Sequence, residues 1–462
     1  MHLRSRAKYI EINGDVSPRV SSVEETLTKI IPICKKIGVT RISDITYLDH
    51  LYIPNYTAVL PGTEDLFWVY SGKGLTKAHA KTSALMESIE RYCSLASTYS
   101  GNFIQGTYSE LSKSYNKVLH PDEVVEPVER KYNDRDSIID FLMGYDLLTH
   151  ERVLVPAELV FCSYTAKPPA THMFLYSHTN GLASGNVLEE AICQALSEVI
   201  ERDAVSIADL CSSCIPFTIL EKITKSLTEG YKDRVSQFTQ DKFVDDPSIF
   251  SEVDISEIMN EFVPLKLLAK RFTNAGIPLL IKNITQKDIG IPTFVASSIE
   301  WVSKDYGYFA RGYGTHPDAR IALIRAITEV SQTRAVTIQG ARDDMKKIQY
   351  KENEEIYKRK WEFMPTSAFS GKNNNKNKTN FRQIDTYVKK DILEDIELIL
   401  NNLKQAGVKR AIVVELTNPN IGIPVVRVIV PGLETFEVAK LYVSDQLFMG
   451  SRAKKYWTSL FS

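Results

Sequence analysis

The sequence is poor in cysteine, with six in 462 residues and no spacing that is typical of a disulfide framework. The only close pair is Cys211 and Cys214, which form a CxxC. No second CxxC or histidine pair completes a tetrahedral zinc set. We interpret these two thiols as ordinary residues that follow a helix, and their role stays open.

Long apolar runs are also lacking, and no stretch approaches the ~20 residues that a transmembrane helix needs. The start of the chain, residues 1–8, has no apolar core of a secretory signal. The formal net charge is -1, so there is no overall basic field to attract nucleic acid. These absences predict a cytoplasmic protein with neither a membrane nor a nucleic acid as partner.

Residues 177–203 predict a glycine turn that leads directly into a strong helix. Four polar residues recur along it at steps of four, four and three, and they are Glu190, Gln194, Glu198 and Glu201. This spacing places them on one face of the helix. The like charges of Glu198 and Glu201 repel each other unless a cation lies against them.

The same pattern occurs three times along the chain. Residues 83–91 align without gaps to residues 194–202, and residues 325–332 form a weaker third copy. Each copy follows a glycine-rich segment, at 71–74, 180–185 and 312–314, which we interpret as a turn. Three units of strand, glycine turn and helix indicate an internal repeat.

A second repeat predicts a helix, a glycine stop, a strand, a turn and a return strand, at 274–292 and again at 405–424. Duplicated modules of this kind predict an α+β fold in which helices lie on antiparallel sheets. The other predicted elements are a strand at 8–12, a helix at 22–36, strands at 66–70, 174–176 and 425–430, amphipathic pieces at 220–238 and 255–262, and a hairpin at 145–160. Residues 371–380 are polar and cationic, which predicts a mobile surface loop.

The length would allow about three domains, but the repeats favour one large catalytic unit. We predict an N-terminal segment, residues 1–65, that packs on the core. The catalytic domain would then span residues 66–462, with a flexible insert near 343–390.

If the first two acidic helices face each other, their carboxylates need counter-charge, and hard divalent cations supply it. Lys73 lies between two glycines, and Arg91 and Arg202 each follow the second Glu of their helix, so these three residues could contact phosphate. Lys73 is in no GxxxxGK[ST] context, so this is not a P-loop. The alternative is that the Glu-x-x-Glu-Arg helices are solvated surface faces, which is common for a single copy but less so for two copies in register. His178 and His316 lie next to the second and third glycine turns, and we interpret both as turn or capping residues and not as catalytic bases.

These motifs together resemble the YcaO-domain family over about residues 66–431. The matching pieces are Ser71-Gly72-Lys73-Gly74, Ser83 with Glu87, Glu90 and Arg91, Asn180-Gly181 with Asn186, Glu190, Gln194, Glu198, Glu201 and Arg202, Gly314 to Asp318 with Glu329 and Gln332, and Arg427 to Gly432.

The resemblance implies the YcaO fold, with its duplicated modules around a central nucleotide pocket, and ATP and Mg²⁺ as cofactors. It implies Mg²⁺ ligands at Glu87, Glu90, Glu190, Glu198 and Glu201. It implies nucleotide contacts at Lys73, Ser83, Arg91, Asn186, Gln194, Glu329 and Gln332. The residues that would carry catalysis are Glu87, Glu198, Glu201 and Arg202.

Members of the family activate a peptide-backbone amide by phosphorylating its oxygen, with ATP as the phosphate donor. The chain shows no proline after Pro431, whereas many azoline-forming members end in a proline-rich tail. It also shows no fused leader-binding domain. We therefore expect a stand-alone enzyme that forms a thioamide, similar to the members that work with a TfuA-like protein.

Two alternatives to thioamide formation stay open at this point. One is an azoline-forming cyclodehydratase of a bacteriocin-type ribosomal peptide. The other is a non-catalytic ATP-binding accessory factor for protein methylthiolation. The expected partners are a peptide or protein substrate and a separate accessory protein that donates sulfur or delivers the substrate. The oligomeric state is open, with a homodimer among the alternatives.

Overall fold

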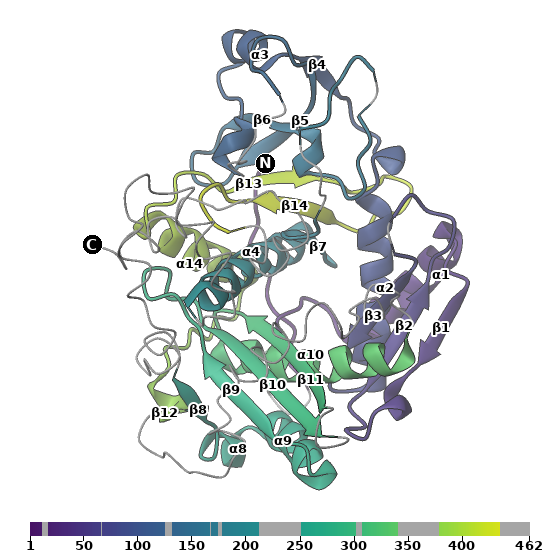
Figure 1. The fold of residues 1–462 in the computed structure, drawn as a ribbon, viewed down its shortest axis with the longest axis vertical. Helices are drawn as coiled ribbons and strands as arrows, with labels where there is room; N and C mark the ends of the chain where they lie inside the picture. The colour runs from purple at the N-terminus through teal and green to yellow at the C-terminus, as the bar shows by residue number, and fades with distance from the viewer. Residues whose placement is uncertain are drawn as a thin grey trace.

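The computed structural model describes residues 1–11, 17–65, 67–124, 132–166, 168–173, 178–211, 251–301, 307–340 and 378–434. Its strands form three sheets, which Figure 1 shows arranged around the middle of the molecule. The strands are β1 (Arg41–Asp44), β2 (Asn55–Val59), β3 (Val69–Lys73), β4 (Ile104–Gly106), β5 (Ile139–Asp146), β6 (Arg152–Pro156), β7 (Leu182–Ser184), β8 (Glu252–Asp254), β9 (Leu279–Asn283), β10 (Thr293–Trp301), β11 (Gly307–Thr315), β12 (Lys378–Asn380), β13 (Ile412–Glu415) and β14 (Val425–Ile429).

The first sheet has the order β1-β2-β3, and the second has the order β11-β10-β9-β8-β12. The third has the order β4-β5-β13-β14-β7, with β6 paired to β5. Neighbouring strands are antiparallel except for β12 and β8, which are parallel. The α-helices are α1 (Val23–Ile37), α2 (Lys77–Cys93), α3 (Tyr108–Ser114), α4 (Leu188–Cys211), α8 (Ile258–Glu261), α9 (Val263–Ala275), α10 (Ala319–Gln339) and α14 (Ile392–Gln405). The predicted α+β class is therefore confirmed.

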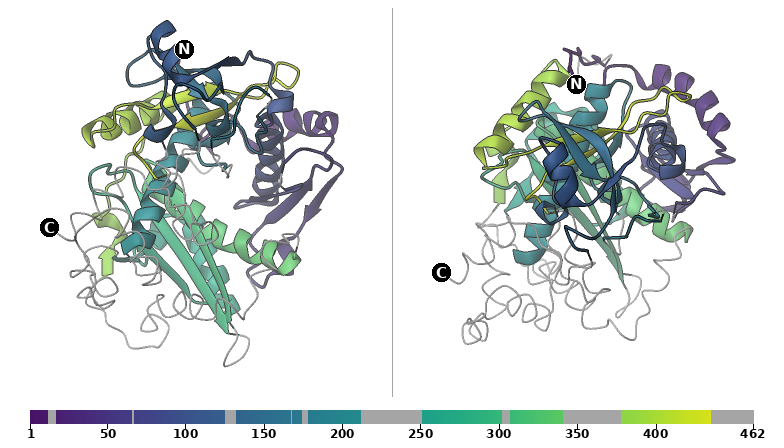
Figure 2. Two further views of the ribbon diagram at one scale, coloured as in Figure 1. Left: turned by 45° about the horizontal axis from the view of Figure 1, so that its top comes forward. Right: turned by 90° about the horizontal axis from the view of Figure 1, so that it is seen from above.

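Three buried apolar clusters hold these layers together. One lies between α1, α2 and the six-stranded sheet, and a second lies between α4, α14 and strands β13 and β14. The third lies between α9, α10 and the five-stranded sheet. Figure 2 shows, from two further sides, the helices α2, α4 and α10 bordering the same central region. Each of these helices follows a strand closely in the chain, as the repeat predicts.

The predicted glycine turns are wrong in the first and third copies. Gly72 lies within β3, and Gly312 and Gly314 lie within β11. A β-carbon at Gly72 would overlap the backbone of Ala80 and Ala84, and one at Gly314 would overlap the backbone of α10. These glycines are therefore needed because a helix rests directly on the strand, and not because the chain reverses there.

Both helix-and-strand modules are confirmed. Helix α9 ends at Gly276, which has a φ of 67°, and leads into β9 and β10. Helix α14 is followed by Gly407, which has a φ of 86°, and leads into β13 and β14. Glycine accepts this left-handed backbone without strain, which is why the helices end where the sequence predicts.

Other predictions are also confirmed. The helix predicted at 22–36 is α1, which Ser22 caps through a reciprocal contact with Glu25. The hairpin predicted at 145–160 is the antiparallel pair of β5 and β6. The acidic helices α2, α4 and α10 lie where the three copies predict them.

Three local predictions are wrong. Residues 8–11 form no strand, because Lys8 turns inward to a buried ion pair with Asp395. The strand predicted at 66–70 is β3, which begins at Val69. Residues 378–380, predicted as part of a mobile loop, form β12, because pairing along β8 needs backbone groups and not apolar side chains.

The rest of that loop, the strand predicted at 174–176, the piece predicted at 220–238 and Cys214 lie outside the described residues. Of the piece predicted at 255–262, residues 258–261 form the short helix α8. The division at residue 65 stays a prediction. Among the helices described, none combines the length and the apolar character that crossing a bilayer requires.

A candidate nucleotide and metal site between three acidic helices

Helices α2, α4 and α10 border the centre of the molecule (Figure 1), and the predicted carboxylates that they carry act on one another through their charges. Glu87 and Glu90 come from α2, Glu198 and Glu201 come from α4, and Glu329 comes from α10. We call these five side chains the acidic cluster. Strand β7 joins the first two helices, because the backbone N–H and the hydroxyl of Ser184 both reach a carboxylate oxygen of Glu90, at 3.1 and 3.5 Å.

Burial raises the pKa of three members of the acidic cluster. The pKa of Glu90 lies well above its ordinary value because the side chain is buried, and because Glu198 and Glu87 add their negative charges. Burial also raises the pKa of Glu198. For Glu201, burial together with the charge of Glu329 raises the pKa to about 7. These carboxyl groups are therefore close enough to oppose one another's ionisation.

Cationic side chains border the acidic cluster on two sides. Lys73, at the end of β3, forms an ion pair with Glu329 across the gap between the first sheet and α10. Arg202 lies one turn after Glu198 on α4, with its Nε 3.9 Å from that carboxylate. Arg427, on β14, is a third cation, and its charge lowers the pKa of Glu198.

Two predicted nucleotide contacts are engaged with protein groups. Arg91 makes a two-pronged ion pair with Asp65, at 2.8 and 2.6 Å, which raises the pKa of the guanidinium despite its burial. Gln332 donates to the backbone carbonyl and the hydroxyl of Ser71, both at 2.8 Å. Arg91 therefore fixes the end of α2, and Gln332 fixes α10 to β3.

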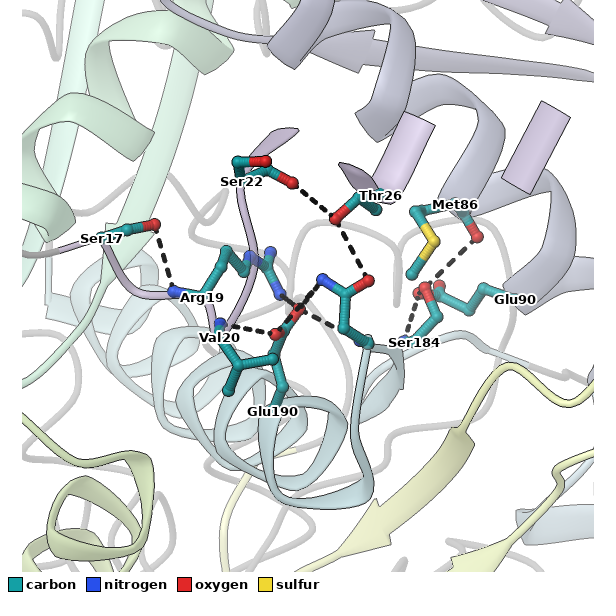
Figure 3. A network of polar contacts seen from close by, with 10 residues as sticks. Ser17, Arg19, Val20, Ser22, Thr26, Met86, Glu90, Ser184 and Glu190 are labelled. Atoms are coloured by element: carbon teal, nitrogen blue, oxygen red, sulfur yellow. Dashed lines mark hydrogen bonds and ion pairs between the residues drawn. The ribbon is translucent and has the colours of Figure 1, made fainter. Parts of the chain in front are cut away.

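Glu190 lies in the first turn of α4, where the N-terminal segment covers it (Figure 3), and Asn186 lies just before this helix. Arg19 donates to Glu190 from its Nη1 at 3.0 Å, and the backbone N–H of Val20 reaches the other oxygen at 3.2 Å. Thr26 donates to the amide oxygen of Asn186 at 3.1 Å. The structure therefore pairs Glu190 with a basic side chain from residues 17–22.

Ser83 lies one turn before Glu87 on α2, and Gln194 lies between Glu190 and Glu198 on α4. Ser83 is half-buried on α2, one residue before the Ala84 that rests on β3. Gln194 is half-buried on α4, and its amide oxygen is buried with no hydrogen-bond partner among the described residues. A buried acceptor without a partner is uncommon in native proteins, and it is consistent with a donor supplied by a ligand.

The acidic cluster fits a bound divalent cation by its chemistry. The pKa values of Glu90, Glu198 and Glu201 are raised by burial, and neighbouring carboxylates add to these shifts, so the cluster is stabilised when positive charge is added. Within the described ranges, the structure shows no group of three or more acidic, histidine or cysteine side chains that could hold a metal ion. Mg²⁺ ordinarily completes its shell with water and phosphate oxygens, so a bound nucleotide would have to supply ligands here.

Sequence reasoning missed three residues of this region as candidates. Arg427 is 1% exposed on an otherwise apolar strand, and a charge in the middle of a run of valine and isoleucine was a readable signal. Arg19 and Thr26 could not be found in this way, because nothing in their surroundings predicts a contact with α4.

The prediction for His316 is confirmed, since its Nδ1 accepts from the backbone N–H of Asp318 at 2.9 Å. His178 instead contacts Arg427, with 2.9 Å between its Nδ1 and the guanidinium. The histidine before the second helix is therefore part of the site region and not only a cap.

Comparison with known proteins identifies the family. A family model described as YcaO cyclodehydratase, ATP- and Mg²⁺-binding, matches residues 71–243 and 244–434. The chain belongs to the YcaO family. The resemblance inferred from the motifs is thereby confirmed, and so are ATP and Mg²⁺ as cofactors.

Relatives of this YcaO protein span nearly its whole length. An uncharacterised protein of Methanothermobacter thermautotrophicus is 33% identical over 91% of this chain and 96% of its own length. A protein of Rhizobium leguminosarum bv. trifolii, named for its position in the tfuA 3′ region, is 29% identical over 95% of this chain and 93% of its own.

Solved structures share the fold. YcaO from Methanopyrus kandleri, solved with AMPPCP and Mg²⁺, has a TM-score of 0.62 at 22% identity and covers 91% of this chain and 94% of its own. A heterocyclase in complex with substrate and cofactor has a TM-score of 0.67 at 22% identity and covers 94% of this chain. This chain spans only 54% of that heterocyclase. The YcaO protein described here is accordingly a peptide-modifying enzyme of an ATP-dependent family, while the roles of its individual residues stay predictions.

Proposed function

We propose that this YcaO protein phosphorylates the oxygen of a peptide-backbone amide, with release of ADP and phosphate. The observation that carries the proposal is the acidic cluster, in which burial and mutual repulsion raise the pKa values of Glu90, Glu198 and Glu201. Such a cluster is costly for the protein alone and becomes favourable when it holds Mg²⁺ and a polyphosphate.

The described residues divide into two roles in this proposal. Glu87, Glu90, Glu198 and Glu201 would hold Mg²⁺, which supplies neutralisation of the phosphate charges. Lys73 and Arg202 would bind phosphate oxygens directly, since each lies at the border of the acidic cluster. The unpartnered amide oxygen of Gln194 would accept from the nucleotide. Glu190 would join the metal ligands after Arg19 leaves it.

The bonds that form and break in this reaction lie in the nucleophile, the amide and ATP, and not in the protein. A nucleophile adds to the amide carbonyl, the carbonyl oxygen becomes an oxyanion, and this oxygen attacks the γ-phosphorus of ATP. The bond between the γ-phosphorus and the bridging oxygen breaks, which releases ADP. The C–O bond then breaks and phosphate leaves. Positioning and charge neutralisation therefore supply most of the catalysis, as expected for phosphoryl transfer.

We further propose that the nucleophile is a sulfide, so that the product is a thioamide. The support is the Rhizobium relative from the tfuA region, which matches 95% of this chain. A TfuA-like accessory protein would deliver the sulfur. An azoline product, in which a Cys, Ser or Thr side chain of the substrate is the nucleophile, is the alternative that the product analysis below separates.

Isotope transfer tests amide phosphorylation most directly. Candidate peptides carrying ¹⁸O at the target carbonyl are incubated with the full chain, Mg²⁺·ATP and sulfide, and the released phosphate is analysed by mass spectrometry. We expect ¹⁸O in the phosphate. Phosphate released without the label would show that water, and not the amide, attacks ATP. A thioamide product gains the mass difference between sulfur and oxygen, whereas an azoline product loses one water.

Two variants complete the test. Glu87→Gln should lower peptide-dependent phosphate release about 100-fold or more, because it removes one charge from the acidic cluster. Glu397→Gln is the matched control, since this carboxylate is exposed on α14 and lies outside the cluster. A protein that binds ATP but never releases phosphate in a peptide-dependent way would instead be an accessory factor.

A further inference from the structure

Arg427 is buried on a face of β14 that is otherwise apolar. Along this strand Val426 and Val428 pack in the cluster beneath α4 and α14. Val425 and Ile429 pack in the opposite cluster, against α2 and strand β5. Because side chains alternate along a strand, Arg427 shares the side of Val425 and Ile429. Its side chain is 1% exposed, which is rare for an arginine without a full set of partners.

The guanidinium is only partly satisfied. Its Nη2 donates to Nδ1 of His178 at 2.9 Å, whereas Nε and Nη1 are buried with no hydrogen-bond partner among the described residues. A buried donor without a partner destabilises the fold, and more so when the group is charged. Elsewhere in the chain the equally buried Arg334 is held by Asp49 and Glu300 in ion pairs. Two N–H donors of Arg427, at Nε and Nη1, are therefore left without a partner among the described residues.

The charges around Arg427 show which part of the site it serves. Burial lowers the pKa of the guanidinium, and the charges of Glu198 and Glu90 partly oppose that shift. Lys73 acts instead on Glu201, whose pKa it lowers. In the structure Lys73 is paired with Glu329 of α10, whereas Arg427 lies on the side of β14 that packs against α2. A ligand held at Lys73 by its phosphates would extend toward Arg427 across the carboxylates.

We infer that Arg427 binds the oxygen that passes from the peptide carbonyl to phosphate, and that His178 positions it. The inference rests on the proposed function. In that reaction the oxygen is negative twice, first as the oxyanion formed when the nucleophile adds, and again as part of the phosphate that leaves. A planar guanidinium with unused N–H donors stabilises both states through charge-assisted hydrogen bonds.

His178 holds the guanidinium through a hydrogen bond that depends on the tautomer of its ring. Arginine can only donate, so Nδ1 of His178 accepts, and the proton of the neutral ring lies on Nε2. This contact fixes the plane of the guanidinium in a strand that offers it no other described partner. His178 is therefore a positioning residue, and its replacement should affect turnover through Arg427 and not through nucleotide affinity.

A binding experiment tests the oxygen site without relying on turnover. Inorganic phosphate is titrated by calorimetry into the full chain saturated with Mg²⁺·ADP, because the leaving phosphate still carries the transferred oxygen. We expect Arg427→Gln to weaken phosphate binding about 10- to 100-fold, as the loss of one charge-assisted bond would. The affinity for Mg²⁺·ADP should stay unchanged. Peptide-dependent phosphate release should fall about 10²- to 10³-fold through kcat, with the KM for ATP unaltered.

Each other result overturns the inference. Weaker binding of Mg²⁺·ADP in Arg427→Gln would mean that the guanidinium holds the nucleotide's own phosphates. Unchanged phosphate binding, or no phosphate binding by the unaltered protein, would mean that there is no oxygen site at Arg427. The proposed function fails separately, if the unaltered protein releases no phosphate in response to peptide.

Matched variants guard against a change in folding. Arg427→Lys and Arg334→Lys both keep the charge of an equally buried arginine and both lose its planar donors. Only Arg427→Lys should weaken phosphate binding, although both should lower the melting temperature. His178→Gln should lower kcat less than Arg427→Gln does and leave the KM for ATP unchanged. An equal loss of phosphate binding in both lysine variants would assign the effect to stability alone and overturn the inference.

Discussion

Glu201→Gln should make the protein more stable while removing its response to Mg²⁺·ATP. The carboxyl group of Glu201 is 9% exposed, and burial with the charge of Glu329 raises its pKa from 4.5 to about 7. Below pH 4.5 the group is protonated in both the folded and the unfolded chain, so it has no effect. Between pH 4.5 and 7 the unfolded chain loses the proton while the folded protein keeps it. Folding is therefore weakened as pH rises through this window.

The size of the effect follows from the shift. A shift of one pKa unit corresponds to about 1.4 kcal/mol. The shift of Glu201 from 4.5 to about 7 therefore lowers the free energy of unfolding by about 3 kcal/mol above pH 7, where the group is ionised. Glutamine cannot ionise and keeps nearly the same volume. The variant should consequently lose less stability than the unaltered protein between pH 5 and pH 8. Functional sites are often destabilising in this sense, and their removal often stabilises the fold.

Urea denaturation at pH 5, 6, 7 and 8, without metal or nucleotide, measures this difference. The midpoints of the unaltered protein and of Glu201→Gln should lie close together at pH 5 and separate by pH 8, with the variant higher. Glu397→Gln, at an exposed position of α14, should follow the unaltered protein. If the urea midpoints of Glu201→Gln and of the unaltered protein changed with pH in parallel, the reasoning would be refuted, since Glu201 would then not be buried among like charges.

Other predictions follow from single contacts. Lys73→Met should weaken Mg²⁺·ATP binding about 10-fold at pH 7 in a calorimetric titration. The positive charge of Lys73 lowers the pKa of Glu201, so its loss leaves less of that carboxylate ionised to hold Mg²⁺. Equal affinity would place the phosphates elsewhere. Gly72→Ala should lower the free energy of unfolding in urea by about 1–3 kcal/mol, since the new methyl overlaps helix α2; an unchanged midpoint would show that the helix can shift freely. Arg19→Gln should raise the affinity for Mg²⁺·ATP, because it frees Glu190; weaker binding would show that Arg19 contacts the nucleotide instead.

The carboxylates could be predicted from the sequence because they follow a periodic rule. Glu87, Glu90, Glu198 and Glu201 lie at helical spacing within two aligned copies, so their common face needs no knowledge of the fold. The helices α2, α4 and α10 and the two modules that end at Gly276 and Gly407 were readable for the same reason. Local patterns decide these elements.

Contacts between distant segments could not be predicted in this way. The pairing of Arg19 with Glu190 joins residues 171 positions apart, and no pattern around Arg19 marks it as the partner of that carboxylate. The glycines of β3 and β11 were misread because the same residue serves a turn and a close helix contact, and only the fold distinguishes these uses. Strand β12 was missed because its three residues pair through backbone groups alone.

The hydrogen bonds from Gln332 to Ser71 have a mechanical consequence. Ser71 lies two residues before Lys73 on β3, and Gln332 lies one helical turn after Glu329 on α10. A displacement of α10 would therefore carry both members of the ion pair between Lys73 and Glu329 in the same direction. Strand β3 and helix α10 would then move together as one rigid unit. The distance that changes would be the one between Lys73 and the carboxylates of α4.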